Sequence, residues 1–300
     1  MRATALALFG LIAACAASSA GPAPTGHPLE GRIFELAGGR EIDEAALAAR
    51  LAVADIAILG EVHDNAAHHR RQARLVAALE PAGVAFEMVP EASEEGVAVF
   101  LEQGGAAAEV GPAIGWERLG WPDWALYRPV FEAASGAYLA GGGVAQDRIS
   151  LAMRVGAVAG FGPGAGEYGL TEPLAPAERA AAEAEMVAAH CDMLPAEVAG
   201  PMVEAQRLRD ARFAHAARRA SRRGGGKAVL ITGNGHARTD RGVPAYLAAR
   251  EPGLVVRALA QIEVDPRRQG IADYARADLP YDYVWFSPPV ARPDPCEAFR

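Results

Sequence analysis

The stretch Asp55-Ile-Ala-Ile-Leu-Gly60-Glu-Val-His-Asp-Asn65 decides the fold. It begins with a short apolar run that stops at Gly60, which is typical of a buried strand in a parallel sheet. Ionisable and hydrogen-bonding residues follow the glycine at once, so the strand leads into a polar turn. Residues 66–79 are expected to form the next helix. The stretch therefore predicts a strand, a polar turn and a helix in succession.

Further strands are expected along the chain. The candidates are residues 84–88, 143–149, 228–232, 255–264 and 281–286. Strand, helix and strand at this spacing indicate right-handed βαβ units. We therefore predict an α/β fold whose mostly parallel central sheet is flanked by helices, with a helical cap inserted over the carboxyl edge of the sheet.

The predicted organisation follows composition along the chain. Residues 1–14 are expected to be a lipoprotein signal peptide, residues 15–30 a flexible tether rich in Ala, Ser, Gly and Pro, and residues 291–300 a C-terminal tail. The α/β domain then covers residues 31–290. The mostly helical stretches at about 90–140 and 170–225 are predicted to form the cap.

Composition excludes one class of function. Of the 300 residues, 51% are hydrophobic and 22% are charged, as in an ordinary globular protein. The net charge of −8 argues against nucleic-acid binding, which needs a clustered positive surface. Residues 207–223 are an exception, since they contain seven arginines. These belong either to a solvated helix end or to a clamp for carboxylates or phosphates.

The N-terminus indicates export. Arg2 precedes an apolar run at residues 3–14, which has the length of a signal peptide and is too short to span a bilayer. The run ends in Ile12-Ala-Ala-Cys15, which fits a bacterial lipobox with Cys15 as the lipidated residue. Ordinary cleavage after Ala20 is the alternative. Ala16 favours sorting to the outer membrane, so we expect a lipid-anchored protein of the cell envelope that faces the periplasm.

Export bears on the two remaining cysteines, Cys191 and Cys296. They could form a disulfide in an oxidising compartment. Nothing in the sequence shows that they lie close together, so pairing stays open. They do not form a metal-binding Cys-x-x-Cys motif.

Polar residues gather where the predicted strands end, and ligands of open α/β sheets bind at that edge. Glu61 and His63 follow the first strand, Glu87 lies near the end of the second, and His236 follows the strand at 228–232. Both histidines stand in Gly-x-x-His turns. His and Glu together suit a transition metal or acid–base chemistry near neutral pH. His68 and His69, in the first turn of a helix, are either further ligands or exposed residues of the helix start.

Several blocks carry a resemblance to a known family. They are Gly31-Arg-Ile-Phe, Leu59-Gly-Glu-Val-His-Asp-Asn-Ala-Ala-His-His69, Phe86-Glu-Met88, Trp116 with Trp121-Pro-Asp-Trp124 and Tyr127-Arg-Pro129, Ala205-Gln-Arg-Leu-Arg-Asp210, Gly233-Asn-Gly-His-Ala237 and Gly242-Val-Pro244. In this order, over residues 31–250, the chain resembles the ChaN-type haem-binding proteins of the Tiki superfamily. The resemblance implies a membrane-anchored, dimeric lipoprotein that binds haem for iron uptake, with an outer-membrane haem or iron transport system as partner.

The resemblance and residue chemistry together suggest groups that contact haem. Arg148 carries over from the family pattern, although the residues before it, Ala145-Gln-Asp, depart from that pattern. Gln206, Arg209 and Asp210 share one polar helix face, because they lie at i, i+3 and i+4. Arginines suit the propionates, and iron takes His, Tyr, Met or Cys. The candidate cofactor-binding residues are His63, Tyr127, Arg148, Tyr168, Gln206, Arg209 and His236.

Aromatic residues are concentrated in the predicted cap. They are Trp116, Trp121, Trp124, Tyr127 and Phe131. Aromatic side chains dominate ordinary cores, and they also form the walls of sites for flat, apolar ligands. The sequence leaves both roles open.

A second function uses the same strand ends. The wider Tiki superfamily includes metal-dependent proteases and erythromycin-esterase-like hydrolases, which resemble this chain in the paired Gly-x-x-His turns with an intervening Glu. In that case Glu61, His63, Glu87 and His236 would hold a divalent transition metal that activates water. A degenerate site that survives only as a binding scaffold is a third possibility.

The lipobox gives a first prediction. We expect Cys15→Ser to abolish lipidation and to leave unprocessed precursor or a soluble product, because the acyl chains need the cysteine. Mass spectrometry of the native protein measures the outcome. A mature chain that begins at Gly21 without acyl mass would overturn the lipoprotein prediction.

Overall fold

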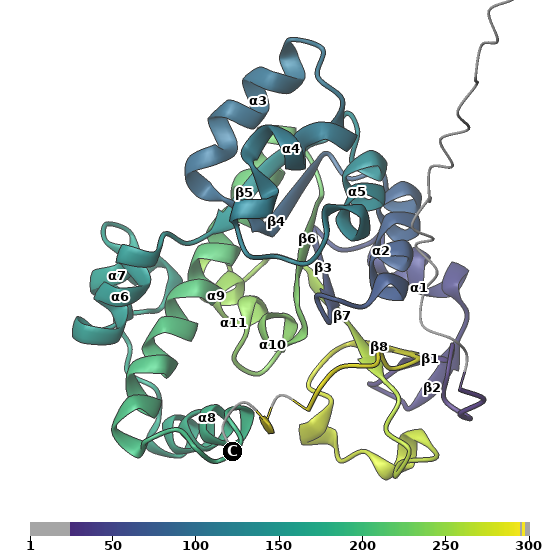
Figure 1. Ribbon diagram of the computed structural model, residues 1–300, viewed down its shortest axis with the longest axis vertical. Coiled ribbons are helices and arrows are strands. Elements are labelled where there is room, and N and C mark those ends of the chain that lie inside the picture. Colours follow the sequence, from purple (N-terminus) through teal and green to yellow (C-terminus); the bar gives the residue numbers. More distant parts are fainter. Residues whose placement is uncertain (1–24, 295, 298–300) are drawn as a thin grey trace, which may run out of the picture.

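The computed structural model describes residues 25–294 and 296–297 (Figure 1). The expected signal peptide, Cys15 and most of the expected tether lie outside the described residues. Leu29, at the end of the expected tether, is fully buried. Packing against the domain therefore begins before residue 31.

One mixed, mostly parallel sheet of eight strands runs through the molecule, in the order β2-β1-β8-β7-β3-β6-β4-β5. The strands are β1 (Ile33–Glu35), β2 (Arg40–Ile42), β3 (Ile56–Glu61), β4 (Gly83–Pro90), β5 (Tyr138–Gly143), β6 (Ala228–Gly233), β7 (Val256–Glu263) and β8 (Tyr283–Ser287). Strand β1 pairs in antiparallel fashion with β2 and with β8, and the other strand pairs among the described residues are parallel. The predicted α/β fold with a mostly parallel sheet is confirmed.

The register of the central strands aligns the two Gly-x-x-His turns. Strand β3 pairs with β6 in parallel, so that Gly60 lies opposite Thr232 and Glu61 opposite Gly233. Strand β4 pairs with the other side of β6. The three strands that carry the candidate residues are therefore neighbours whose carboxyl ends meet at one edge.

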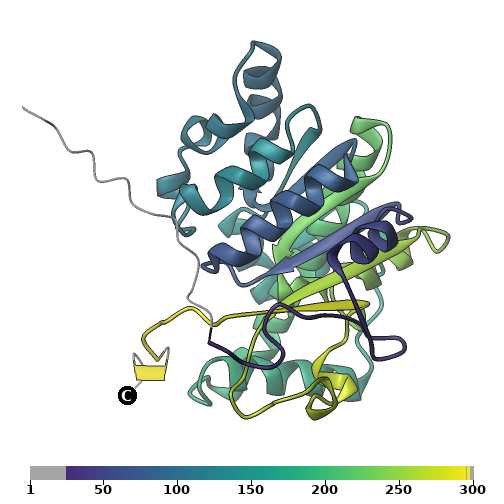
Figure 2. The same ribbon diagram turned by 90° about the vertical axis from the view of Figure 1, so that its right-hand side faces the viewer.

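Helices cover both faces of the sheet, as the two views show (Figures 1 and 2). Along β3, Ala57 and Leu59 join the core on one face, whereas Ile56 and Ile58 join the core on the other. This alternation is the period of a strand that is buried on both faces. On the first face lie α1 (Glu44–Leu51), α2 (Ala66–Leu79) and α5 (Trp124–Ala133). On the second lie α6 (Gln146–Val155), α7 (Ala157–Phe161), α9 (Ala196–Gly224) and α11 (Val243–Arg250).

The two segments predicted to form the cap, at about 90–140 and 170–225, differ in where their helices lie. Helices α3 (Glu94–Glu102) and α4 (Val110–Ile114) lie beyond the end of the sheet, and α8 (Pro176–Ala189) packs on α9. Helix α9 itself packs along β4 and β5, so much of the second predicted cap segment covers the sheet face. The remaining short elements are α10 (Asn234–Ala237) and the 3-10 turns Glu91–Ser93, Ala107–Glu109, Trp116–Arg118, Ala165–Tyr168, Ile271–Asp273 and Arg276–Asp278.

The strand predicted at residues 143–149 is wrong. Strand β5 ends at Gly143, and α6 already begins at Gln146. Gly141, Gly142 and Gly143 belong to β5, where glycine is needed because β4 passes very close. A Cβ on Gly141 would lie 2.6 Å from the Pro90 carbonyl oxygen, and one on Gly143 would lie 2.9 Å from that of Val89.

Cys191 and Cys296 form a disulfide, with their Cα atoms 5.6 Å apart. The bond joins the end of α8 to the C-terminal segment. That segment is also held beside the sheet by Arg292, which forms ion pairs with Asp64 at 2.6 Å and Glu263 at 2.7 Å. The pairing that the sequence left open is therefore made.

No helix in the described part of the chain has the length and apolar character that crossing a membrane requires.

The packing of α9 on β4 generates a prediction about stability. A Cβ on Gly83 would lie 2.2 Å from the carbonyl oxygen of Ala220, so backbone atoms would have to move. We expect Gly83→Ala to lower the free energy of unfolding by about 1–3 kcal/mol, measured by urea denaturation. Gly38→Ala is the control, since nothing lies within 4 Å of its Cβ position. Equal stability of the two variants would contradict the close approach.

Candidate functional site

The carboxylate of Glu61 anchors the first histidine turn. Glu61 is buried at the end of β3, and its Oε1 lies 2.8 Å from Nδ1 of His63. The same oxygen accepts a hydrogen bond of 2.7 Å from the hydroxyl of Tyr127, on α5. The other oxygen, Oε2, lies 3.4 Å from Nδ1 of His69. A buried carboxylate is stable only with such partners, so Glu61 fixes the ring of His63.

These contacts shift the pKa values of both partners. Burial acts to raise the pKa of Glu61, but His69 and His63 outweigh it and hold the pKa well below its usual range. Burial acts to lower the pKa of His63, but the hydrogen bond and charge of Glu61 raise it to about 9. About a third of the His63 side chain is exposed, so its Nε2 can meet a ligand. His63 is therefore an accessible cation at neutral pH.

His236 is held in the same way in the second turn. It lies on α10, directly after β6, and its Nδ1 is 2.7 Å from Oδ1 of Asp210. The side-chain nitrogen of Gln206 approaches Nδ1 at 3.1 Å. Burial raises the pKa of Asp210 to about 6, although His236 acts to lower it. Burial acts to lower the pKa of His236, but Glu87 and Asp210 raise it.

Glu87 lies between the two imidazoles. Its Oε2 accepts hydrogen bonds from the Thr232 hydroxyl at 2.7 Å and from the Gly233 amide at 2.8 Å. Its Oε1 is 3.6 Å from Nε2 of His236 and 4.0 Å from Nε2 of His63. The structure thus brings Glu61, His63, Glu87 and His236 together, with each imidazole oriented at Nδ1 and directed at one shared oxygen through Nε2.

His68 and His69 are fully buried rather than exposed at the helix start. Nε2 of His69 lies 2.9 Å from the carbonyl oxygen of His63. His68 accepts a hydrogen bond from the amide of Val62 and contacts the Ser287 hydroxyl at 2.7 Å. Burial, with the charge of Arg71 nearby, lowers the pKa of His68 to about 3. Both residues therefore hold the turn in place.

The two candidate tyrosines differ in their access to ligands. Tyr127 is fully buried, and its hydroxyl is used by Glu61. Burial, strengthened by the negative charge of Glu61, holds the pKa of Tyr127 far above its usual value. Tyr168 contacts a cavity, and its hydroxyl lies 3.0 Å from Nδ1 of His215. Of the two, only Tyr168 lines a cavity.

The first cavity has a volume of about 1010 Å³ and opens between α8, α9 and α11. His63 and His236 line it, together with Gln206 and Asp210, which contact His236. Much of the wall is apolar. Its apolar residues include Leu174, Ala177, Ala181, Ala182, Met186, Val203, Ala245 and Ala249.

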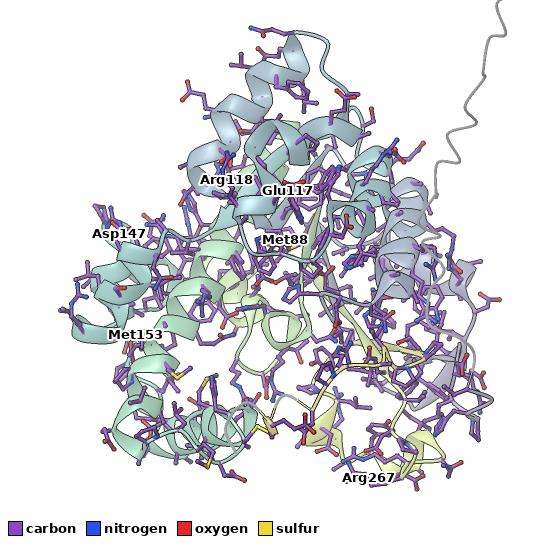
Figure 3. All side chains as sticks on the ribbon, in the orientation of Figure 1. Met88, Glu117, Arg118, Asp147, Met153 and Arg267 are labelled. Carbon is purple, nitrogen blue, oxygen red and sulfur yellow. A yellow bond between two sulfur atoms is a disulfide. The ribbon has the colours of Figure 1, made fainter. Side chains whose placement is uncertain are left out.

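A second cavity, of about 820 Å³, shares the lining residue His236 with the first. It is bounded by the carboxyl ends of β4 and β5, by α6 and by α9. Arg148, Arg209, Arg212 and Trp121 line it. Met88 also lines this cavity. Figure 3 shows Met88 near the centre of the view and Asp147 of α6 at the periphery. The ring of Trp121 lies 5.0 Å from that of His63, whereas Trp116, Tyr127 and Phe131 are core residues.

The cluster does not fit a metal ion as it is arranged. Across residues 25–294 and 296–297, no group of three or more His, Cys, Asp or Glu side chains is positioned to hold one. Oxygen Oε2 of Glu87 is used by Thr232 and Gly233, and Oε1 stands at ion-pair distances from the imidazoles. The divalent metal predicted from the sequence therefore gains no support.

The fold and site define an α/β protein with a paired histidine site at the carboxyl edge of its sheet. The family model for haem-binding uptake proteins of the ChaN type, in the Tiki superfamily, matches residues 47–247. The chain belongs to this family, as the sequence predicted.

A solved structure supports the fold. A Campylobacter jejuni ChaN structure with cofacially bound haem is similar, with a TM-score of 0.64 and 19% identity over 84% of this chain and 95% of that one. The type III effector HopBA1 gives a TM-score of 0.44 and 16% identity over 91% and 99% of the two chains. No curated protein gives a significant match.

Sequence reasoning missed several residues of the site. The contact of Asp210 with His236 was not foreseen, although Asp210 shares a predicted helix face with Gln206. Thr232 and Trp121 were not assigned to the site either. The helical spacing was a usable signal for Asp210, whereas the position of Trp121 depends on an irregular loop that has no periodic pattern.

The raised pKa of His63 gives a prediction. In Glu61→Gln the hydrogen bond to a charged carboxylate is lost, so we expect the pKa of His63 to fall from about 9 toward its ordinary 6.5. NMR titration of the imidazole protons measures it. Glu132→Gln removes an exposed carboxylate from α5 and should leave the titration unchanged.

The same shift fixes the pH dependence of stability. Because the pKa of His63 is higher in the folded than in the unfolded protein, protonated His63 stabilises the fold. This contribution to the free energy of unfolding is complete below about pH 6.5 and is lost as the pH rises through about 9. The wild type should lose this contribution across that window, and Glu61→Gln should lose much less. An unchanged His63 titration in Glu61→Gln would show that Glu61 is not the cause.

Proposed function

We propose that this protein binds haem at the carboxyl edge of its sheet and serves haem or iron uptake. Membership of the ChaN family supports haem binding in general. The observation that carries the proposal for this chain is the first cavity, a mostly apolar space whose lining includes two oriented imidazoles. Sites for large organic ligands are concave, mostly apolar and equipped with a few convergent polar groups.

The residues of this cavity fit a porphyrin. The small and apolar side chains of α8 and α11 leave a space in which a flat macrocycle loses contact with water. Residue types that can ligate iron line this cavity at His63, Tyr168 and His236. Bound haem would supply the iron centre. The protein's own residues would enclose the ring and direct imidazole or phenol atoms toward the metal.

The location of the protein belongs to the same proposal. The lipobox at Cys15 would anchor the chain to the outer membrane, facing the periplasm. The disulfide between Cys191 and Cys296 is in keeping with an oxidising compartment. We also propose that the protein forms a homodimer and works with an outer-membrane haem or iron transport system. These two parts of the proposal rest on the family resemblance alone.

A second candidate function is hydrolysis, and one observation favours it. His63 and His236 are each oriented at Nδ1 by a carboxylate and face one carboxylate oxygen through Nε2. Two such imidazoles can act as base and acid toward water and a leaving group. This version depends on proton transfer alone, since the four residues are not arranged to hold a metal.

Filling the first cavity tests haem binding. Titration of the purified protein with haemin should give a Soret band that saturates. In Ala182→Trp an indole enters the cavity from a buried position of α8. We therefore expect the Kd for haemin to rise at least roughly tenfold, which corresponds to a loss of about 1.4 kcal/mol or more of binding free energy. Ala180→Trp is the matched control, because Ala180 is exposed on the same helix and does not line the cavity.

Two further results keep this test decisive. If Ala182→Trp unfolds, Met186→Trp makes the same change from a half-buried position of the same wall. If the wild type gives no saturable Soret band, haem binding is rejected. Turnover of p-nitrophenyl esters that disappears in His63→Ala and in His236→Ala would then favour the hydrolase.

A further inference from the structure

Helix α8 is thinly packed for an element that walls a cavity. Its residues Ala177, Ala181, Ala182 and Met186 contribute to the lining of the first cavity. Among its 14 residues, all of them described, Ala182 is the single buried one. Elements with few buried apolar contacts open locally at a small cost in free energy, while the core stays closed. Helix α8 therefore has the packing of a movable cover.

The N-terminal end of α8 is fixed to the body of the domain. Just before the helix, Arg207 of α9 donates to the carbonyl oxygens of Leu170 and Glu172. Early in the helix, Arg179 pairs with Glu204 of α9 at 2.8 Å. Helix α9 itself packs along the sheet, so these contacts leave this end of α8 little freedom to move.

The C-terminal end of α8 is held from farther away. Cys191 forms the disulfide with Cys296 of the C-terminal segment. An ion pair between Glu185 and Arg241 also links this half of α8 to the loop before α11. Both charged side chains are partly exposed, and ion pairs of that kind contribute little. The disulfide is therefore the stronger of these two restraints.

The C-terminal segment connects this restraint to the histidine site. Arg292 forms ion pairs with Asp64 and with Glu263. Asp64 directly follows His63, which lines the first cavity. Cys296 follows Arg292 by four positions, and four residues span at most about 14 Å. The disulfide thus keeps the end of α8 within a short distance of the turn on the opposite wall.

The turn that follows α8 is strained. Cys191 and Asp192 both have positive φ, at 60° and 58°. Residues other than glycine avoid this left-handed region and stay in it only where the surrounding structure holds them. The disulfide is attached to the first of these two residues. Breaking the bond would therefore let the turn relax and would free the end of α8.

The position of the bond allows its reduction without loss of the sheet. Both cysteines are half-buried and lie outside the two hydrophobic cores of the described chain, so a dithiol can reach a sulfur atom. One thiolate of the dithiol attacks a sulfur and forms a mixed disulfide, and its second thiol then displaces the protein cysteine. Two electrons and two protons pass to the protein. Cys191 and Cys296 become thiols, and the dithiol becomes a disulfide.

We propose that α8 is a lid over the first cavity and that the redox state of the Cys191–Cys296 disulfide controls it. The disulfide holds the lid closed. Reduction by a dithiol, of the kind that dithiol oxidoreductases carry, releases the C-terminal half of α8 and lets a ligand enter or leave. The lid depends on no particular ligand, whereas its effect on haemin rests on the proposed function.

Hydrogen–deuterium exchange tests the lid without any ligand. The samples are the wild type, the wild type reduced with dithiothreitol, and Cys191→Ser/Cys296→Ser. We expect the amides of residues 182–189 to exchange at least roughly tenfold faster once the bond is absent, because α8 then opens more easily. The amides of β3 and of residues 203–217 should exchange as before, since they belong to the closed core.

A matched control keeps the bond and adds the same side chains. Ala188→Ser/Ala291→Ser places serines at exposed positions of α8 and of the C-terminal segment. Its exchange should equal that of the oxidised wild type, and dithiothreitol should accelerate it. Dithiothreitol should have no effect on Cys191→Ser/Cys296→Ser, which has no such bond to reduce.

Haemin release measures the effect on a ligand. In transfer of haemin to an excess of a haem-scavenging protein, we expect the dissociation rate to rise roughly tenfold when the bond is reduced or replaced, because the opening of a lid limits escape. The Ala188→Ser/Ala291→Ser control, left oxidised, should release haemin at the wild-type rate.

Each outcome decides between the lid and the proposed function. Unchanged exchange of α8 after reduction overturns the lid. Faster exchange throughout β3 and α9 also overturns it, since the bond would then stabilise the whole fold. Faster exchange of α8 with unchanged haemin release overturns the control of binding. A wild type without a saturable Soret band rejects the proposed function and leaves exchange to decide the lid. If Cys191→Ser/Cys296→Ser does not fold, the reduced wild type supplies the comparison.

Discussion

The buried carboxylate of Glu61 is the interaction on which the site depends. It ends the central strand β3, where water cannot solvate it, so its charge has to be met by protein groups. Those groups come from the His63 turn, from His69 on α2 and from Tyr127 on α5. One ionised side chain therefore links the sheet to α2 and α5, two of the helices that cover its first face, and it sets the protonation of His63, the more exposed of the two imidazoles of the site.

The parallel register of β3 and β6 repeats this device at a second position. Asp210 on α9 does for His236 what Glu61 does for His63, so each imidazole is held at Nδ1 by its own carboxylate. Glu87, from β4, lies between them at a point where the pairing of β4 with β5 is irregular. Irregular pairing is common beside functional sites, because it redirects a side chain that a regular strand would bury. The two histidine turns are thus alike in chemistry but differ in surroundings. Mostly apolar residues line the first cavity, whereas three arginines line the second.

The sequence predicted the parts of the molecule that local patterns determine. Apolar runs that stop at Gly60 and Gly233 marked two strands, and their carboxyl ends carry the histidines as expected. The strand expected at residues 143–149 failed because the Gly141–Gly143 run allows close backbone approach, a tertiary constraint with no periodic signal. His68 and His69 are polar at the start of a helix, and only the neighbouring turn and β8 show why they are buried. Pairing of the cysteines depends on where two distant segments meet, which sequence spacing cannot reveal.

The disulfide also orders the maturation of the protein in time. Its two cysteines are 105 positions apart, and Cys296 follows all eight strands. The covalent link from α8 can therefore close only after the whole sheet has been synthesised. Helix α8 forms one wall of the first cavity, and its covalent link to the C-terminal segment is therefore made only after the sheet has been synthesised. A chain made where thiols stay reduced would have the sheet and both histidine turns, but it would lack the bond that ties that wall to the C-terminal segment.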